Sequence, residues 1–361
     1  MIKRITILVF CASMFFVLII DACKSSKVSS LQKQHTIGLY IPKGWPKPTF
    51  DIFENNPVTE EGFQLGRKLF YDGILSRDGS TACATCHQQF AGFSSFDHNL
   101  SHGINNSLTT RNAPVLFNLA WMRELHWDGG INHIEVQPIA PITAENEMGE
   151  TLENVLYKLR RDKVYVDLFS KTFGDTIINT QRVLKALAQF TGSIQSYNSK
   201  YDKVKNGEAN FSASEQAGYE FFKSNCNTCH KEPLFTDNAF HNIGLPINNS
   251  LKDYGQMKIT NKPEDSLKFK TPSLRNIALS QPYMHDGRFI NFSKIIEHYN
   301  TLDIVNLKNI DPVLKAKKII VTPSNRVDLI AFLHTLTDSA MTHDARFSSP
   351  INNSPVFIDK H

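Results

Sequence analysis

The sequence has few of the features that mark several common classes of protein. Lys and Arg form no run dense enough for a nucleic-acid groove, and the net charge of +4 is spread thinly over 361 residues. Strand signals are few, and the composition shows neither disorder nor collagen-like repetition. Of the six cysteines, one lies in an N-terminal apolar run, one follows it, and four form two copies of one pattern. No cysteine is therefore left for a structural disulfide.

The first residues read as an export signal. MIKR supplies a positive start, the apolar run 5–20 follows, and Cys23 comes shortly afterwards behind a small residue. The apolar run is shorter than the ~20 residues that span a bilayer, so a retained membrane anchor is the weaker alternative. We predict a lipoprotein-type signal peptide over 1–22, a lipid on Cys23, a polar tether over 23–56, and a location in the periplasm or cell envelope. A plain secretory signal is the other alternative.

The pattern C-x-x-C-H occurs twice in the chain. The copies consist of Cys83, Cys86 and His87, and of Cys226, Cys229 and His230. Two thiols at this spacing add to the vinyl groups of one haem, and the adjacent His reaches the iron as the proximal ligand. One copy alone would also suit a redox dithiol or half of a zinc site. Two copies in an exported chain, with no further cysteines for zinc, favour two covalent c-type haems.

Each haem motif follows an amphipathic segment, GFQLGRKLFYD before the first and EQAGYEFFKSN before the second. Further helical patterns cover residues 151–173, 179–197 and 327–336. We therefore predict a mainly α fold with two cytochrome-c-like haem domains and long loops, for which 41% hydrophobic residues leave enough material. The predicted N-terminal haem domain covers 57–205, the C-terminal haem domain 206–340, and a tail 341–361.

The segment HWDGGINHIEVQPIAPITAENEMG places Trp127, Gln137 and Glu147 at intervals of ten residues. Here the chain resembles the bacterial dihaem cytochrome c peroxidase family, including its MauG branch. The resemblance covers nearly everything from about Phe63 to Leu336 and includes LGRKLFYDGILSRDGSTACATCH, TRNAPVLFNLAW, the second haem motif and FKTPSLRNIALSQPYMHDGRF. Several separate motifs in the family's order make coincidence negligible.

The resemblance implies a role for each of these three residues. The haem of the first motif would meet hydrogen peroxide, Glu147 would move a proton between the peroxide oxygens, and Gln137 would hydrogen-bond the bound peroxide. Trp127 would lie between the haems and shorten electron hops. A surface Glu, a loop Gln and a packing Trp are the ordinary alternatives. Glu145 is the nearby competitor of Glu147, two residues out of register.

A further expectation concerns the sixth ligand of the C-terminal haem. The family's distal ligand lies fourteen residues after the His of the HDG motif, here His285, and Tyr299 occupies this position. The stretch INFSKIIEHYN predicts a helix that begins after Asn291 and turns Tyr299 inward. Met284 is the rival ligand, and His298 is expected to face polar surface. Because a phenolate lowers the potential relative to Met, Tyr299 favours the MauG branch. A hydrogen bond to a carbonyl is the ordinary alternative for this phenol.

The peroxide-binding iron is expected to be open. In this family, members that need reductive activation carry a distal His in a loop after the first haem motif. The corresponding loop here, DHNLSHGINNS, has Ile104 at that place. His98 and His102 remain alternative ligands through an adjustment of the loop.

The resemblance also implies contacts between the two domains. His285 would lie in the region between the haems. A calcium ion would be held by the Asn112 side chain and by the carbonyls of Ser280 and Pro282. The alternative for Asn112 is an amide that braces a turn.

The resemblance thus predicts an oxidoreductase of the cytochrome-c peroxidase type with two covalently bound haem c groups. It would reduce hydrogen peroxide to water with electrons that an external donor, such as a small c-type cytochrome, passes through the C-terminal haem. The alternative is a MauG-like, peroxide-dependent oxidation of a protein or organic substrate. A simple dihaem electron carrier is less favoured, because it would need neither Glu147 nor an open iron. The only expected membrane contact is the N-terminal lipid, and a homodimer is compatible with the family.

Overall fold

The computed structural model describes residues 39–48, 51–307 and 309–350. All of these residues belong to one compact unit. The predicted signal peptide, Cys23 and most of the predicted tether lie outside the described residues. Within the described ranges, no helix combines the length and the apolar character needed to cross a membrane.

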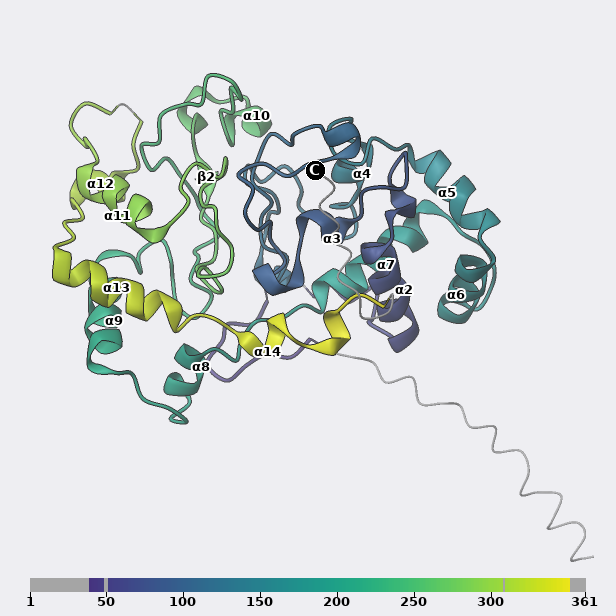
Figure 1. Ribbon diagram of the computed structural model, residues 1–361, viewed down its shortest axis with the longest axis horizontal. Helices are drawn as coiled ribbons and strands as arrows, with labels where there is room; N and C mark the ends of the chain where they lie inside the picture. The colour runs from purple at the N-terminus through teal and green to yellow at the C-terminus, as the bar shows by residue number, and fades with distance from the viewer. Residues whose placement is uncertain (1–38, 49–50, 308, 351–361) are drawn as a thin grey trace, which may run out of the picture. The chain divides into compact units, whose positions relative to one another are not determined.

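Helices and loops make up nearly all of the described chain, which confirms the predicted mainly α fold (Figure 1). The α-helices up to residue 205 are α2 (Glu60–Tyr71), α3 (Cys83–Cys86), α4 (Ile139–Thr143), α5 (Leu152–Arg161), α6 (Lys163–Phe173), α7 (Thr180–Gly192) and α8 (Lys200–Lys205). Those that follow are α9 (Ala213–Asn225), α10 (Met257–Thr260), α11 (Phe292–Thr301), α12 (Pro312–Ala316), α13 (Pro323–His334) and α14 (Ser339–Thr342). The 3-10 turns are η1 (Gly73–Leu75), η2 (Gln89–Ala91), η3 (Ile104–Asn106), η4 (Leu119–Trp121), η5 (Pro263–Asp265) and η6 (Ala345–Phe347). The strands β1 (Phe240–His241) and β2 (Phe269–Lys270) pair antiparallel.

Capping side chains determine where the predicted helical stretches begin and end. The segment 151–173 forms two helices, α5 and α6, because Asp162 ends the first and caps the second by accepting a hydrogen bond from the backbone N–H of Val164. Helix α11 begins after Asn291, as predicted. The Asn291 side chain accepts a hydrogen bond from the backbone N–H of Lys294.

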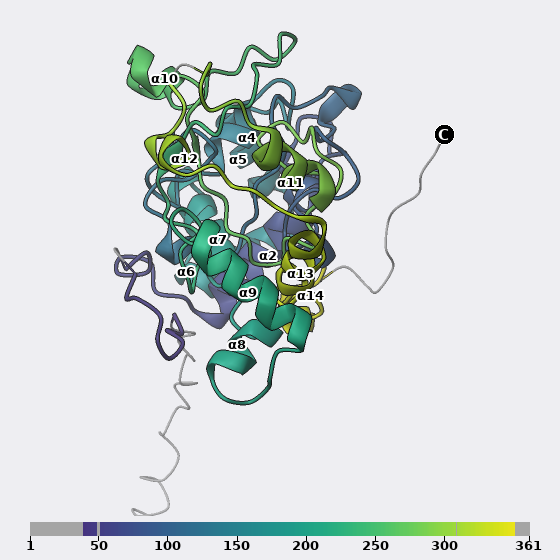
Figure 2. The same cartoon turned by 90° about the vertical axis from the view of Figure 1, so that its left-hand side faces the viewer.

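Two helix pairs repeat the same crossing in the two halves of the chain. Helix α2 packs against α7, and α9 packs against α13 (Figure 1; Figure 2 shows the second pair side by side). At each crossing a glycine faces the backbone of the partner helix. A Cβ on Gly66 would overlap the carbonyl of Ala186, and a Cβ on Gly218 would overlap the carbonyl of Asp328. The two halves therefore share a two-helix frame.

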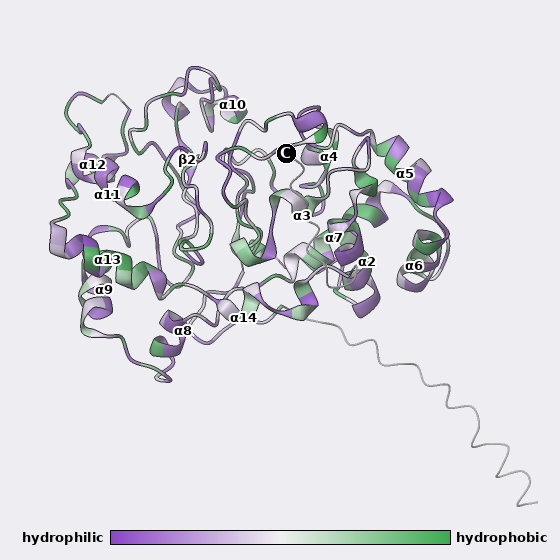
Figure 3. Ribbon diagram, in the orientation of Figure 1, coloured by the Kyte–Doolittle hydropathy of each residue, from purple (hydrophilic) through white to green (hydrophobic). Residues whose placement is uncertain are grey.

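A separate hydrophobic cluster surrounds each helix pair. The first is built mainly from residues 53–194 and also contains Phe347 from the C-terminal segment. The second is built from residues 201–336 and contains Tyr201. Figure 3 shows hydrophobic, green stretches along α13, which belongs to the second cluster. The C-terminal segment thus completes the core of the N-terminal half, while the predicted domain boundaries stay a prediction.

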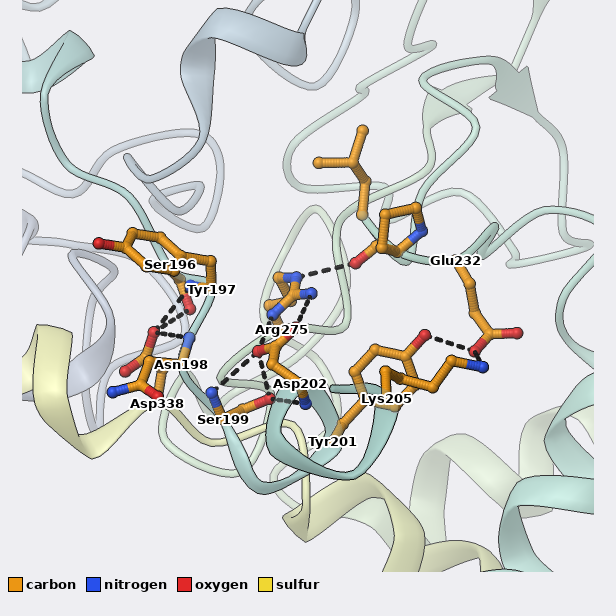
Figure 4. Close-up of polar contacts among 12 residues, drawn as sticks. Ser196, Tyr197, Asn198, Ser199, Tyr201, Asp202, Lys205, Glu232, Arg275 and Asp338 are labelled. Carbon is orange, nitrogen blue, oxygen red and sulfur yellow. Dashed lines mark hydrogen bonds and ion pairs between the residues drawn. The ribbon is translucent and has the colours of Figure 1, made fainter. Parts of the chain in front are cut away.

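Two buried carboxylates fix the segment between the halves (Figure 4). Oδ2 of Asp338 accepts hydrogen bonds from the Ser196 hydroxyl at 3.2 Å and from the next two backbone N–H groups at 2.9 Å each. Asp202 accepts two hydrogen bonds from the guanidinium of Arg275, at 2.8 and 2.7 Å. Buried charges are stable in such places only when they are paired or fully hydrogen-bonded. This junction is therefore a rigid part of the molecule.

Candidate haem sites and the region between them

The first haem motif lies on α3 and the residue that follows it. The Nδ1 atom of His87 lies 3.0 Å from the carbonyl oxygen of Phe93. A carbonyl only accepts, so Nδ1 carries the proton and Nε2 is left free for a metal. Burial lowers the pKa of His87 to about 4 and raises the pKa of the Cys83 and Cys86 thiols to about 12 and about 11. A neutral imidazole in this tautomer beside two free, half-buried thiols fits a c-type haem.

The second haem motif repeats this arrangement at the end of α9. Cys226 caps the helix, and Nδ1 of His230 lies 3.2 Å from the carbonyl oxygen of Phe235. Burial raises the pKa of Cys226 to about 12 and lowers the pKa of His230. Both C-x-x-C-H motifs therefore present their histidine to a metal through Nε2.

A cavity of about 270 Å³ lies beside the second motif. It is lined by the motif residues Cys226, Cys229 and His230 and by one face of α11, namely Phe292, Ile295, Ile296 and Tyr299. The predicted inward face of α11 is thus confirmed. Burial raises the pKa of Tyr299, whose hydroxyl forms no hydrogen bond within the described part of the chain. A half-buried phenol without a partner, in the same cavity as His230, is compatible with a metal ligand, and ligation by Tyr299 stays a prediction.

The neighbours of Tyr299 behave differently from one another. Met284 lines the same cavity and so remains the rival ligand. The expectation that His298 faces polar surface is wrong. Its Nε2 donates a hydrogen bond to the carbonyl of Ile243 at 2.9 Å, and its ring lies 5.8 Å from that of Phe289. The segment around Ile243 covers this side of α11, which the spacing of residues within one helix could not reveal.

Glu147 and its competitor Glu145 have different surroundings. The Glu145 side chain is 78% exposed and pairs with Arg77 at 2.8 Å. Burial raises the pKa of Glu147, and the charge of its carboxylate contributes to the raised pKa of the thiols of Cys83 and Cys86. Of the two carboxylates, Glu147 is the one beside the first haem motif.

The loop with the two alternative histidines runs past Glu147. The backbone N–H of Ile104 donates to the carbonyl of Glu147 at 2.8 Å. The Nδ1 atom of His102 is buried and has no hydrogen-bond partner in the described residues, whereas His98 is exposed. An unpaired buried nitrogen in this loop keeps His102 open as a ligand, and the coordination of the first iron stays a prediction.

Three of the predicted residues meet in the region between the motifs. The indole N–H of Trp127 donates to the carbonyl of Asn112 at 2.8 Å, and the backbone N–H of Asn112 donates to the carbonyl of His285 at 2.8 Å. The His285 ring stacks on Phe269 at 3.7 Å, and burial lowers the pKa of His285 to about 4. All four residues line the cavity described above.

Gln137 also lines this cavity, next to a histidine that the sequence analysis missed. Its amide nitrogen lies 3.5 Å from Nε2 of His126, whose pKa is lowered by burial. No hydrogen bond joins Gln137 to Glu147 among the described residues. Lys270 was missed as well: it lines the cavity, and burial lowers its pKa to about 8. His126 directly precedes Trp127, so its place in the same motif was the available signal.

The predicted calcium ligands Asn112, Ser280 and Pro282 also line the cavity. The amide nitrogen of Asn112 donates to the carbonyl of Asn99 at 3.3 Å, which leaves the amide oxygen as an acceptor. This orientation is compatible with a cation and equally with a braced turn.

A further cluster beside the second motif resembles a metal site but does not fit one. Ligand atoms of Cys229, Asp237 and His241 lie within 4.8 Å of one another. The two ring nitrogens of His241 lie 2.9 Å from Asp237 and 2.6 Å from Asp311, and hydrogen bonding, chiefly to Asp237, raises the pKa of His241 to about 11. An imidazolium that donates from both nitrogens has no lone pair for a metal. Asp311 lies far away in the sequence, so the spacing of residues gave no sign of this cluster.

Comparison with known proteins agrees with this geometry. Residues 60–210 match the family described as Di-haem cytochrome c peroxidase. The methylamine utilization protein MauG of Methylophilus methylotrophus is 35% identical over 294 residues, which cover 80% of this chain and 85% of that protein. The cytochrome c551 peroxidase of Nitrosomonas europaea is 29% identical over 321 residues, 85% of this chain and 89% of that protein. The crystal structure of a MauG-like protein associated with microbial copper homeostasis has a TM-score of 0.77 at 31% identity, and covers 86% of this chain and 98% of that one.

Two motifs that fit covalent haem on a helical fold define a two-haem, c-type oxidoreductase. The chain belongs to the di-haem cytochrome c peroxidase family, and its similarity to MauG supports the MauG-like branch of that family. Two c-type haems, one at each C-x-x-C-H motif, follow from this membership.

Proposed function

We propose that this protein reduces hydrogen peroxide to water with electrons from an external donor, taken in through the C-terminal haem. When bound at His87 and His230, the haems supply the redox-active irons. The observation that carries the proposal is the half-buried carboxylate of Glu147 beside the first motif, whose pKa is raised by desolvation. Its neighbour Glu145 is exposed and forms an ion pair with Arg77.

The chemistry requires a proton to pass between the two oxygens of peroxide. The Glu147 carboxylate takes the proton from one oxygen and delivers it to the other, which then leaves as water. Burial raises the proton affinity of Glu147, so the carboxyl group is a better acceptor than an exposed one. The Gln137 amide would hydrogen-bond peroxide without competing for the proton. The hydrogen bond from His87 to Phe93 holds the imidazole in one tautomer.

Glu147→Gln tests this role directly. The amide keeps the size of the side chain but cannot carry the proton, so the rate of peroxide consumption is expected to fall about 10²–10⁴-fold. Stopped-flow absorption of the holoprotein after mixing with hydrogen peroxide measures this rate. Glu145→Gln is the matched control and should leave the rate unchanged, because that side chain is exposed. Equal rates in Glu147→Gln and the wild type would overturn the role of Glu147.

A second candidate function is favoured by Tyr299. A phenolate ligand would give the C-terminal haem a low potential, unsuited to accept electrons from a high-potential cytochrome. The oxidising equivalents would then be spent on a protein or organic substrate, as in MauG. Turnover with a reduced small c-type cytochrome and hydrogen peroxide separates the candidates. Rapid oxidation of the cytochrome supports the peroxidase. Consumption of peroxide while the cytochrome stays reduced supports the MauG-like activity.

We also propose two features besides the reaction, a lipid anchor and a calcium ion. A lipid on Cys23 would hold the protein in the periplasm or cell envelope, and mass spectrometry of the mature N-terminus tests this. A calcium ion at Asn112 would couple the two halves. Incubation with a calcium chelator should then change the haem spectra, and re-addition of calcium should restore them.

A further inference from the structure

An aromatic cluster backs the haem histidine of the N-terminal half. The carbonyl that accepts from His87 belongs to Phe93. The Phe93 ring packs against Phe190, with centroids 6.5 Å apart, and against Phe347 at 6.3 Å. Tyr71 packs against Phe190 at 6.3 Å, and its hydroxyl donates to the carbonyl of Phe347 at 2.6 Å, so the phenol of this cluster is bound to a backbone carbonyl.

The corresponding cluster in the C-terminal half contains a tyrosine that is bound to a carboxylate. The carbonyl that accepts from His230 belongs to Phe235. The Phe235 ring packs against Phe332 at 6.3 Å and, edge-on, against Tyr201 at 4.8 Å. The Tyr201 ring therefore contacts the residue whose carbonyl accepts the hydrogen bond of the second haem histidine.

The Tyr201 phenol is bound to a carboxylate that also binds a second tyrosine. Its hydroxyl donates to Oε1 of Glu232 at 2.5 Å, and the hydroxyl of Tyr219 donates to the same oxygen at 2.8 Å. Tyr201 is 2% exposed and Tyr219 8%. Figure 4 shows Tyr201 and Lys205 both turned toward Glu232, and the ammonium of Lys205 donates to the Tyr219 hydroxyl at 3.1 Å. The carboxylate therefore links a buried phenol to groups at the protein surface.

These surroundings decide how an electron can leave Tyr201. Burial, and then the hydrogen bond to Glu232, raise the pKa of Tyr201, so the phenol keeps its proton at rest. A phenol that lost only an electron would become a cation in a low-dielectric core, which is costly. The hydrogen bond to Glu232 gives the proton a place to go at the same moment. The group is built so that electron and proton leave together.

We propose that Tyr201 is a redox-active tyrosine that supplies one of the two electrons withdrawn by each hydrogen peroxide. The inference rests on the proposed function. The O–H bond of Tyr201 breaks, its electron passes toward the C-terminal haem, and its proton passes to Oε1 of Glu232, which leaves a neutral phenoxyl radical. The bound haems would supply the other electron and solvent would supply two protons, so that peroxide, two electrons and two protons give two waters. An external one-electron donor then reduces the radical, and Glu232 returns the proton.

Electron paramagnetic resonance tests the proposal. The holoprotein is mixed with one equivalent of hydrogen peroxide and frozen rapidly. The expected signal is an organic radical whose hyperfine pattern narrows in protein labelled with ring-deuterated tyrosine. Tyr201→Phe keeps the ring and its packing but removes the O–H bond, so the tyrosine signal should disappear. In Glu232→Gln an oxygen acceptor remains but cannot hold the proton, and radical formation should slow by about 10²-fold or more.

Tyr165→Phe is the matched control. The Tyr165 hydroxyl donates to Asp72 at 2.8 Å and its side chain is fully buried, so the substitution removes a phenol–carboxylate bond of the same kind from the N-terminal core. The radical should survive this change. A signal that persists in Tyr201→Phe, or a wild type with oxidised haems and no tyrosine signal, overturns the inference and leaves the proposed function standing. Haem absorption that does not respond to peroxide would overturn both.

Discussion

The two halves of the molecule hold a haem histidine in the same way and surround it differently. In each half, Nδ1 of the histidine lies close to a backbone carbonyl, 3.0 Å away for His87 and 3.2 Å for His230. In each half, a glycine lets two helices cross closely. The N-terminal half then adds a half-buried carboxylate, Glu147. The C-terminal half adds two phenols, Tyr299 in the cavity and Tyr201 behind the histidine.

This difference shows how one frame can serve two tasks. The shared elements determine where a haem is attached and which tautomer its histidine adopts. The elements that differ arrive from loops and from distant parts of the chain. A carboxylate suits the movement of protons, whereas phenols suit iron ligation and electron transfer. The frame is therefore separate from the chemistry placed on it.

The largest loss of stability is expected at the buried ion pair of Arg275 and Asp202, which lies against Tyr201 and Phe235 of the C-terminal cluster. Side chains of Arg275 and Asp202 are 0% and 9% exposed. Arg275→Met leaves the Asp202 carboxylate buried without a counter-charge, which is expected to cost about 3–5 kcal/mol of unfolding free energy. Urea denaturation measures this cost. Arg77→Met, which breaks the exposed pair with Glu145, is the control and should cost less than about 1 kcal/mol.

The same pair has a pH dependence with a definite sign. Burial alone would raise the pKa of Asp202, but the hydrogen bonds and charge of Arg275 lower it. The contribution of the pair is therefore present above the unfolded pKa of ~3.9 and is lost as the pH falls through the lower folded pKa. Arg275→Met should lose less stability than the wild type between pH 5 and more acidic values near ~pH 2. An equal fall of unfolding free energy with decreasing pH in Arg275→Met and the wild type would contradict this account.

The shared helix crossing predicts an intermediate and matched effect. Gly66→Ala and Gly218→Ala each push a methyl group into a backbone carbonyl and should each cost about 1–3 kcal/mol. Thermal unfolding of the two holoprotein variants measures the loss of stability at each crossing. Gly130→Ala is the control, because there the methyl group meets mainly the flexible end of Ile259. If only one of the two crossing glycines proved sensitive, the frame would not be the same in both halves.

The smallest effect on folding is expected at the cavity phenol. The Tyr299 hydroxyl has no hydrogen bond in the described chain, so Tyr299→Phe should leave the packing of α11 intact. If Tyr299 binds iron, Tyr299→Phe should change the absorption and electron paramagnetic resonance spectra of the C-terminal haem, while those of the other haem stay constant. Met284→Leu should leave both spectra unchanged. Identical spectra for Tyr299→Phe and the wild type would show that Tyr299 is not an iron ligand.

Local patterns in the sequence were enough to predict part of this arrangement. Spacing identified both haem motifs and the inward face of α11, and the register of ten residues separated Glu147 from Glu145. These features depend on neighbours within a few turns or on the order of motifs. Helical periodicity is a physical consequence of one element's own geometry, so it can be read without the rest of the fold.

Other features depend on contacts between distant segments, and no local pattern reveals them. Ile243 accepts a hydrogen bond from His298, and Asp311 binds His241, although each partner lies more than fifty residues away. Tyr201 looks like an ordinary residue of a polar segment until the packing places it against the ring behind His230. Loops have no period, so the partners of their side chains are set by tertiary packing alone.

The packing of Phe347 in the N-terminal core also governs the order of assembly. A chain synthesised from its N-terminus presents α2 and the first haem motif long before residue 347 follows. The first hydrophobic cluster is therefore incomplete until residue 347 has been added. The η6 turn completes the first hydrophobic cluster, so a protein cut short after α13 would leave that cluster without Phe347.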